Sequence, residues 1–469
     1  MKRVINISVS IIYLLLALLT SGCNDNSTGP DGKPPSNEPN HIWSKRFGNA
    51  NTQYSNGVAC DGSGNLVITG RFRGSVDFGG GELISEGGKD IFIAKFDANG
   101  NHIWSKRFGD SSNQDGNSVA FDESGNVLVT GDFLGSVDFG GGPLRSEGEY
   151  DIFLVKFDAN ANHLWSKSFG DESLDYGQSV SCDGLGNVIV TGTFIGSVDF
   201  GGGLLTGAGG IDIFLAKYDA NGNHIWSKRF GGVASTYCES IACNASGDAV
   251  FTGSFNSPVD FGDGEHGCAG QCNSYLAVLD SDGAHRWSKS FSLSGCQVSN
   301  SVACDGSGNA VITGYFNGMV YFGGDILTSV GSDIGRENDI FIAMFDANGN
   351  HIWSKRFGDS GSGGGSGVGY DVAGNVVITG GFHDTMNFGG GTLTSVGESD
   401  IFIVKFDANG NHLWSKSFRG ENSKSCESII CDESGNVVVT GSFEGTLDFG
   451  GEALTSAGSY DIFLAKFEP

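Results

Sequence analysis

Short apolar runs alternate with polar, glycine-rich turns from about residue 41 to the end of the chain. In the first complete unit the runs cover residues 57–60, 65–70, 90–96 and 102–108. Runs of this length, rich in β-branched residues and bounded by Gly, Asn and Asp, predict strands. An Asp-x-x-Gly-Asn turn joins the first run to the second and the third to the fourth. Asp accepts hydrogen bonds from such a turn and Gly supplies its positive φ, so the pattern predicts two hairpins.

The unit is repeated at a nearly fixed period. Successive tryptophans stand 61 residues apart, except for one spacing of 66. A period of this size is typical of supersecondary units that bury their faces on one another. Seven all-β units, each of four antiparallel strands, predict a seven-bladed β-propeller over residues 41–469. The tryptophans are Trp43, Trp104, Trp165, Trp226, Trp287, Trp353 and Trp414.

One unit is divided between the two ends of the propeller. The run "HIWSKRF" at 41–47 has no "DIFIAKF" partner before it, and the chain ends on "DIFLAKF" at 461–467 with no "HIWSK" after it. Pairing of these two runs would complete the last blade and leave no open sheet edge where the ring closes. The sequence therefore predicts closure by the N-terminal strand.

The repeated residues resemble a known family. "VACDGSGNLVITG" followed by "DIFIAKFDANGNHIWSKRFG" is similar to the bacterial seven-bladed beta-propeller repeat, SBBP. The resemblance covers about residues 40–469 and implies a propeller in an exported or cell-surface bacterial protein. It implies no catalytic residues. Blade four departs most, in residues 256–287.

The first residues are typical of an export signal. Lys2 and Arg3 precede an apolar run at 4–19, and "TSGC" follows. This order indicates a signal peptide over residues 1–22. The junction resembles a bacterial lipobox, which implies lipidation of Cys23, although Thr20 stands where the lipobox has Leu. The alternative is a plain secretory signal cut nearby. Residues 23–40 are polar, with Pro and Gly, and predict a disordered tether.

We therefore expect an exported protein, lipid-anchored to the outer membrane or cell surface. No later run is long enough to span a bilayer, so the lipid would be its only membrane contact. The formal net charge is −27, which disfavours nucleic acid as a partner. We expect a monomer.

No metal or cofactor is expected. "DANGNH" begins like a calcium loop, but its sixth residue is His and the twelfth position is Phe108, which cannot coordinate calcium. One histidine opens the fourth strand of each unit, and single histidines on separate blades would not converge on zinc. "GSGGGSG" at 361–367 lacks the Lys-Ser/Thr of a phosphate loop. The histidines are His41, His102, His163, His224, His285, His351 and His412.

Two disulfides are candidates in an exported chain with 11 cysteines. Cys268 with Cys272, in "CAGQC", is the first, and Cys238 with Cys296 is the second. Other cysteines share one repeat position with Phe121 and Tyr370, which indicates an apolar packing position. These are Cys60, Cys182, Cys243, Cys304 and Cys431.

Chain direction predicts two unlike faces. The Asp-x-x-Gly-Asn turns share one, the short-turn face. The four-to-one and two-to-three loops, longer and more variable, share the other, the long-loop face. Binding residues favour variable loops on a rigid scaffold. Tyr54, Tyr176 and Tyr237 share one register in the four-to-one loops and are the candidate ligand-binding residues.

The sequence thus favours a non-catalytic surface module that binds a protein or glycan through the long-loop face. The alternative is a propeller hydrolase or lyase acting on an extracellular polymer at the mouth of the central channel. Such an enzyme would gather acid, base or metal residues there. The irregular carboxylates and histidines, such as Glu265, His266 and His383, are scattered among blades instead.

Overall fold

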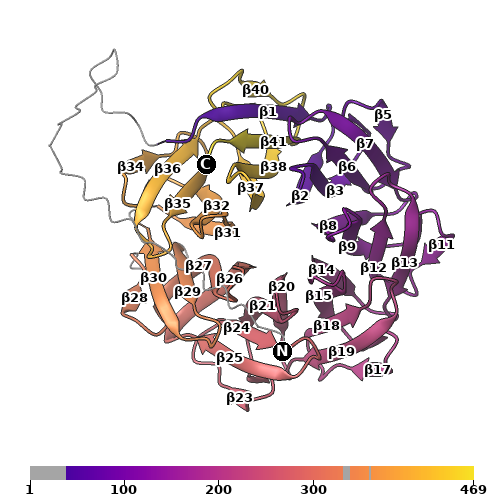
Figure 1. Ribbon diagram of the computed structural model, residues 1–469, viewed down its shortest axis with the longest axis horizontal. Coiled ribbons are helices and arrows are strands. Elements are labelled where there is room, and N and C mark those ends of the chain that lie inside the picture. Colours follow the sequence, from indigo (N-terminus) through magenta and orange to yellow (C-terminus); the bar gives the residue numbers. More distant parts are fainter. Residues whose placement is uncertain (1–37, 331–337, 359–360) are drawn as a thin grey trace, which may run out of the picture. The chain divides into compact units, whose positions relative to one another are not determined.

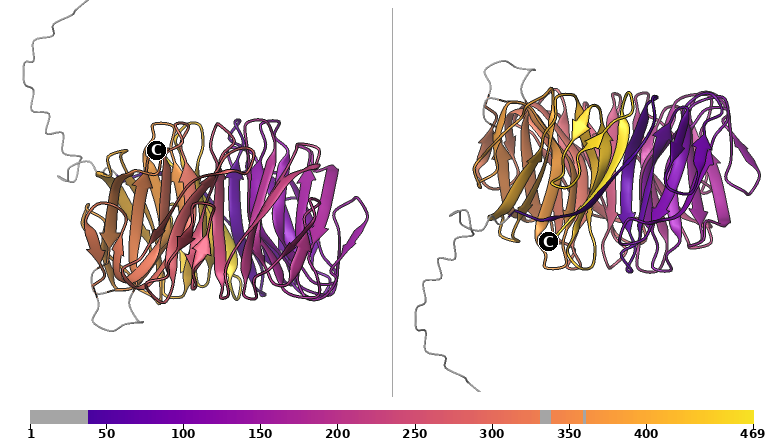
Figure 2. Two further views of the ribbon diagram at one scale, coloured as in Figure 1. Left: turned by 90° about the horizontal axis from the view of Figure 1, so that it is seen from below. Right: turned by 90° about the horizontal axis from the view of Figure 1, so that it is seen from above.

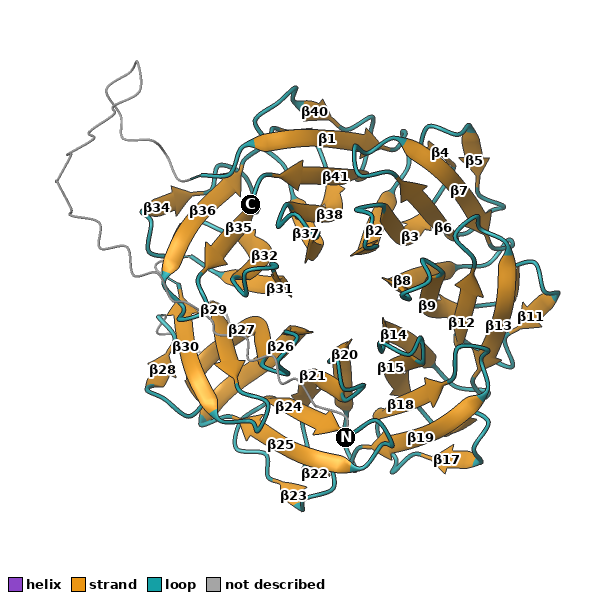
Figure 3. Cartoon of the chain, in the orientation of Figure 1, coloured by secondary structure: helices purple, strands orange, loops and turns teal. Residues whose placement is uncertain are grey.

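A ring of seven four-stranded antiparallel sheets forms the body of the protein (Figure 1). The computed structural model describes residues 38–330, 338–358 and 361–469. All regular elements in these ranges are strands, as Figure 3 shows. The predicted seven-bladed propeller is confirmed. The innermost strands of blades 1 to 7 are β2 (Gln53–Cys60), β8 (Gln114–Phe121), β14 (Asp175–Cys182), β20 (Thr236–Cys243), β26 (Ser294–Cys304), β31 (Gly363–Tyr370) and β37 (Lys424–Cys431).

The other three strands follow outward in sequence order in blades 1 to 6, and in blade 7 the outermost strand is β1. The second strands are β3 (Leu66–Phe72), β9 (Val127–Phe133), β15 (Val188–Phe194), β21 (Ala249–Phe255), β27 (Ala310–Tyr321), β32 (Val376–Phe382) and β38 (Val437–Phe443). The third strands are β6 (Asp90–Phe96), β12 (Asp151–Phe157), β18 (Asp212–Tyr218), β24 (Asn273–Leu279), β29 (Asp339–Phe345), β35 (Asp400–Phe406) and β41 (Asp461–Phe467). The fourth strands are β7 (His102–Phe108), β13 (His163–Phe169), β19 (His224–Phe230), β25 (His285–Phe291), β30 (His351–Phe357), β36 (His412–Phe418) and β1 (His41–Phe47).

The ring closes as predicted. β1 pairs antiparallel with β41, so strands from opposite ends of the propeller complete blade 7. Arg46 forms an ion pair with Asp461, and Phe47 packs on Phe78 and Phe96 of blade 1 with ring centroids 5.0 and 5.3 Å away. β1 therefore covers blade 7 and also contacts the next blade.

A small hairpin in each two-to-three connection lies outside the fourth strand (Figure 1). This corrects the expectation that the whole connection belongs to the long-loop face. Asp77 fixes the first hairpin by accepting from the amides of Gly79 and Gly81. The pairs are β4 (Ser75–Asp77) with β5 (Glu82–Ile84), β10 (Ser136–Asp138) with β11 (Pro143–Arg145), β16 (Ser197–Asp199) with β17 (Leu204–Thr206), β22 (Val259–Asp260) with β23 (Glu265–His266), β33 (Thr385–Asn387) with β34 (Thr392–Thr394), and β39 (Thr446–Leu447) with β40 (Leu454–Thr455). In blade 5, β28 (Ile326–Thr328) pairs with the end of β27.

Strands run between two faces of the ring, and turns and loops gather at both (Figure 2). The Asp-x-x-Gly-Asn turns form as predicted: Asp61 accepts from the amides of Ser63 and Asn65, and Gly64 has φ of 78°. Five of these aspartates also pair with a lysine of the third strand, four of them at 2.8–3.0 Å and Asp61 more loosely. These five turns are therefore tied to the third strand of their own blade.

Serines of the innermost strands join neighbouring blades. The Ser118 hydroxyl accepts from the amide of Val180, and the same contact recurs from Ser179, Ser240, Ser301 and Ser428 to the following blade. The distances are 3.2–3.3 Å. Gly57 and Gly367 replace serine in the other two blades. Along with the buried aromatic residues between the sheets, this contact makes the blade interfaces nearly equivalent.

Candidate ligand-binding site

Three strand registers meet around the axis at the long-loop face, and we call their residues the axial rim. Each blade contributes three residues. One lies in the innermost strand, at the position of Tyr54 in β2, and the second is paired with it in the second strand. The third is the residue immediately before the third strand. The innermost residues are Tyr54, Asp115, Tyr176, Tyr237, Val298, Gly364 and Ser425. Their partners are Arg71, Asp132, Thr193, Ser254, Tyr315, Gly381 and Ser442. The third set is Lys89, Tyr150, Ile211, Cys272, Asn338, Ser399 and Tyr460.

The axial rim varies while its surroundings repeat. In the second strand, a glycine precedes the rim residue and a buried phenylalanine follows it in every blade, as in Gly70 and Phe72 around Arg71. The rim residue itself is Arg, Asp, Thr, Ser, Tyr, Gly or Ser. A fold that needed only seven equal blades would not require this change. The variation therefore indicates that the blades differ in function at the axial rim.

One arc of the rim is crowded with aromatic and charged side chains. The Arg71 guanidinium lies 4.8 Å from the ring centroid of Tyr54, which packs against Tyr460 of blade 7 at 5.4 Å. Tyr176 stacks on Tyr150 of blade 2 at 5.9 Å. Arg71 Nη1 also lies 3.1 Å from Asp115 Oδ1. We call this the crowded arc: Tyr460, Tyr54, Arg71, Asp115, Asp132, Tyr150 and Tyr176.

Two carboxyl groups stand side by side in the crowded arc. Asp115 and Asp132 are directly opposite across β8 and β9, and Asn117 donates to Asp132 Oδ1 at 2.8 Å. Burial, with a smaller contribution from the charge of Asp115, raises the pKa of Asp132 to about 8. Asp132 is 4% exposed, so its proton is held inside the blade and a polymer would not reach it as the side chains stand.

The opposite arc is hollow. A cavity of about 360 Å³ lies where blades 5, 6 and 7 meet the axis. It lies beside the glycine-rich strand β31, whose Gly364 replaces the tyrosine of blades 1, 3 and 4. We call its rim residues the hollow arc: Tyr315, Asn338, Gly364, Gly381, Ser399 and Ser425.

Tyr54, Tyr176 and Tyr237 lie within strands, which corrects their predicted place in loops. Strand β2 begins at Gln53, four residues before the predicted start, and β14 and β20 begin at the corresponding residues. All three tyrosines are half-buried. Tyr54 and Tyr176 each pack against a tyrosine of the preceding blade. Their role as ligand-binding residues stays a prediction.

The sequence reasoning missed Arg71, Asp132, Tyr315 and the paired glycines of blade 6. The signal was present: within the repeated "ITGRF" segment, one position varies among the blades while the Gly before it and the Phe after it do not. Finding it requires alignment of the second strands rather than of the loops. Two-residue periodicity then places that position beside the variable residue of the innermost strand.

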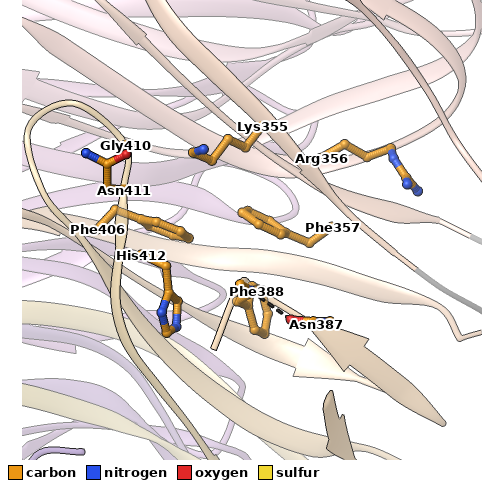
Figure 4. A pocket seen from close by; sticks show the side chains of 10 residues that line it. Lys355, Arg356, Phe357, Asn387, Phe388, Phe406, Gly410, Asn411 and His412 are labelled. Carbon is orange, nitrogen blue, oxygen red and sulfur yellow. Dashed lines mark hydrogen bonds between the residues drawn. The ribbon is translucent and has the colours of Figure 1, made fainter. Parts of the chain in front are cut away.

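A larger cavity lies at the outside of the ring and repeats the same chemistry. About 600 Å³ opens between the fourth strand of blade 5 and the hairpin of blade 6, beside Phe357, Phe388 and His412 (Figure 4). Phe47, Phe78 and His102 occupy the same places at the boundary of blades 7 and 1. Because the groove belongs to the repeated packing, it does not distinguish one blade from another.

Both predicted disulfide pairs are wrong. Cys272 bonds to Cys296, with Cα atoms 4.6 Å apart, and Cys268 and Cys238 are free thiols. The reason lies in blade 5, where β26 begins three residues early and brings Cys296 beside the residue that precedes the third strand of blade 4. Cys238 is instead fully buried within blade 4. Burial raises the pKa of the Cys60 thiol to about 12, consistent with the predicted packing role of its register.

Blade 4 carries a polar cluster on its outer hairpin. Asp263 Oδ1 lies 3.0 Å from His266 Nε2 and accepts from the Ser288 hydroxyl, which also contacts His285 at 3.1 Å. Among the residues that the structure describes, no group of three or more His, Cys, Asp and Glu side chains is arranged to hold a metal ion. The described ranges also include no helix long and apolar enough to cross a membrane.

Comparison with known proteins identifies the repeated unit. The beta-propeller repeat family SBBP matches residues 103–132, which run from the fourth strand of blade 1 through most of the first two strands of blade 2. Residues 103–132 are an SBBP beta-propeller repeat, and the other blades carry the same motif. This confirms the resemblance drawn from the repeated motif.

Other similarities to these SBBP repeats are more distant. An uncharacterized WD repeat-containing protein of Acanthamoeba polyphaga mimivirus is 23% identical over 98% of this chain, and the match spans 40% of that protein. A puromycin hydrolase mutant matches with 10% identity and a TM-score of 0.45, over 85% of this chain and 52% of its own. A gluconolactonase from Xanthomonas campestris matches with 12% identity and a TM-score of 0.32, over 73% and 90%. At these identities no functional residue can be carried over to the SBBP repeats of this chain.

Proposed function

We propose that this SBBP-repeat propeller is a non-catalytic binding module that holds a protein or glycan ligand at its axial rim. The observation that carries the proposal is the variation of three strand registers that converge at the rim while the remainder of each blade repeats. Tyrosine is suited to such a surface, because it offers a large rigid contact area and a polar hydroxyl at low entropic cost. Tyr54, Tyr176 and Tyr237 are the ligand-binding residues of this proposal.

Substitutions on the two faces test the proposal. A screen of glycans and extracellular proteins supplies the ligand. Tyr176→Ala and Tyr237→Ala are then expected to weaken binding by about 1 kcal/mol or more each, the usual scale of truncating an aromatic contact residue. Asn99→Ala and Asn409→Ala, in turns of the short-turn face, serve as controls. If the turn variants abolish binding while folded and the tyrosine variants bind normally, the proposed face is wrong.

The proposal includes an exported, lipid-anchored protein, monomeric and without nucleic-acid partners. Cys23, the signal at 1–22 and all but the last residues of the tether lie outside the described residues. The support for export and anchoring is the sequence of the signal, with its basic start and apolar run, and the "TSGC" junction that follows. Metabolic labelling with a fatty-acid probe is expected to mark the natural chain and not Cys23→Ser. Equal labelling of the two would remove the lipid anchor from the proposal.

A hydrolase or lyase acting on an extracellular polymer is the second candidate. It is favoured by Asp115 and Asp132, a carboxyl pair at the axial rim in which one member keeps its proton near neutral pH. General acid catalysis uses such a group, provided that it reaches the substrate. Activity against a polysaccharide panel that disappears in Asp132→Asn would support this candidate. The burial of Asp132 favours the binding module instead.

A further inference from the structure

The hollow arc differs from the equivalent positions of the other blades in its side chains and not in its backbone conformation. Neither Gly364 nor Gly381 has a positive φ, so the local conformation does not require glycine. A Cβ atom on Gly364 would meet only Tyr315 Cδ1, at 3.8 Å, which is ordinary van der Waals contact. The equivalent position holds tyrosine in three other blades. The fold therefore tolerates a side chain here, and its absence is what leaves the cavity open.

Polar side chains line the cavity. The side chains of Tyr315, Ser366, Ser425 and His383 form no hydrogen bond with other described residues, and each can donate or accept one. The side-chain nitrogen of Asn300 donates to Gly365 O at 2.9 Å, which leaves its side-chain oxygen able to accept from a ligand. A ligand would therefore meet hydroxyl, amide and imidazole groups from three blades.

Lys424 does not make the cavity positively charged. Its ammonium group is buried and lies 3.2 Å from Asp400 Oδ1, 2.9 Å from Gly420 O and 2.6 Å from Asn422 O. These contacts engage all three of its donors. Burial, followed by the nearby Glu239, raises the pKa of the Tyr315 phenol above its usual value of 10, so Tyr315 is neutral at physiological pH.

We propose that the hollow arc binds one neutral sugar ring of a glycan, with Tyr315 as the aromatic platform and the surrounding hydroxyl and amide groups as hydrogen-bonding partners. The inference rests on the proposed binding role of the axial rim and assigns its ligand class. A cavity of about 360 Å³ is at the small end of ligand pockets, which suits a single ring better than a protein segment. Side chains with one apolar face and a polar edge suit a sugar, whose two ring faces are apolar and whose edge carries hydroxyls.

Filling the hollow tests this assignment. Gly364→Tyr places in blade 6 the residue that blades 1, 3 and 4 carry, and Gly306→Tyr is its matched control. Gly306 lies in a turn on the short-turn face, has no positive φ, and has no atom within 4 Å of an added Cβ. The probes are an array of neutral, acidic and amino-substituted oligosaccharides. We expect selective binding of neutral sugars, a tenfold or greater loss of affinity in Gly364→Tyr, and unchanged affinity in Gly306→Tyr.

A second variant keeps the test decisive if Gly364→Tyr lowers the melting temperature. Tyr315→Leu removes the aromatic platform without adding volume and is expected to weaken neutral-sugar binding to a similar extent. Binding that is unaffected by both variants, selectivity for charged sugars, or the absence of sugar binding would each overturn the inference. Loss of ligand in Tyr176→Ala with normal binding in Gly364→Tyr would overturn the hollow as the site while leaving the proposed role of the axial rim intact.

Discussion

The crowded arc and the hollow arc use the same backbone positions in opposite ways. In the crowded arc, Tyr460 on Tyr54 and Tyr150 on Tyr176 fill the blade junctions with stacked rings. In the hollow arc, the backbone N–H of Asn338 donates to the Ser362 hydroxyl, and the Lys424 ammonium group also lies 3.4 Å from Ser399 O, so small or extended groups form the junctions. A disulfide joins blades 4 and 5 between the arcs. The comparison shows that blade packing deeper in the ring leaves the rim free to vary.

The blades also differ in how they balance the buried charge at the start of the third strand. The aspartate that opens the third strand pairs with an arginine of the fourth strand in blades 1, 3, 5 and 7. Blades 2, 4 and 6 have serine in place of that arginine. Blade 4 carries the neutral Asn273, and blade 6 receives Lys424 from blade 7. In blade 2, burial raises the pKa of Asp151 to about 6.

The largest expected effect comes from removing β1, which completes blade 7, the blade between the two arcs. Deletion of residues 41–47 would uncover β41 and remove Phe47 from Phe78 and Phe96 of blade 1. We expect a loss of about 5 kcal/mol or more in the free energy of unfolding from burial alone. Denaturant unfolding measures it, with a chain that begins at residue 38 as the control. Equal stability of the two chains would mean that β1 does not close the ring.

Breaking the buried charge pair of the hollow arc is expected to have the next largest effect. Lys424 and Asp400 are both fully buried, so Lys424→Met leaves an uncompensated carboxylate. Such a change costs about 3–5 kcal/mol. The double variant Lys424→Met with Asp400→Asn reproduces the neutral arrangement of blade 4 and is expected to recover much of the loss. Chemical unfolding of the four chains of this cycle measures the coupling, and simple additivity would contradict it.

The stability of the protein is expected to depend on pH through Asp132 of the crowded arc. Burial raises the folded-state pKa of Asp132 to about 8, above the ordinary value of 3.8. A raised carboxyl pKa gives stability that is fully present below pH 4 and is lost as the pH rises toward 8. Asp132→Asn removes this titration, so its melting temperature is expected to fall less than that of the natural chain between pH 5 and 8. Thermal melts across that range measure the difference, and parallel curves would place the titration elsewhere.

The repeated sequence made the blades and the closure of the ring predictable, but it did not make the axial rim predictable. Repeated Asp-Gly-Asn turns and a fixed period specify hairpins locally, so the strand order of residues 41–469 followed from the chain alone. The start of β2 did not, because Tyr54 and Ser55 are less apolar than the run at 57–60 and take strand form only by pairing with Arg71 and Gly70. The Cys272–Cys296 bond likewise depends on the early start of β26. Both outcomes depend on contacts between segments, which a local pattern does not contain.

The smallest expected effect compares one tryptophan from each side of the ring. Trp104 of blade 1 donates to Ala159 O of the next blade at 3.1 Å, whereas Trp414 of blade 6 is buried with no partner for its Nε1 within the described residues. The difference follows from blade 7, where β41 and β1 come from separate parts of the chain and no turn carbonyl faces Trp414. Replacement by phenylalanine removes a hydrogen bond only in Trp104→Phe, whereas in Trp414→Phe it removes a buried N–H group that has no partner within the described residues. We expect Trp104→Phe to cost about 1 kcal/mol more than Trp414→Phe in the free energy of unfolding. Chemical unfolding of both variants measures this difference, and an equal or larger loss in Trp414→Phe would show that its indole nitrogen has a partner after all.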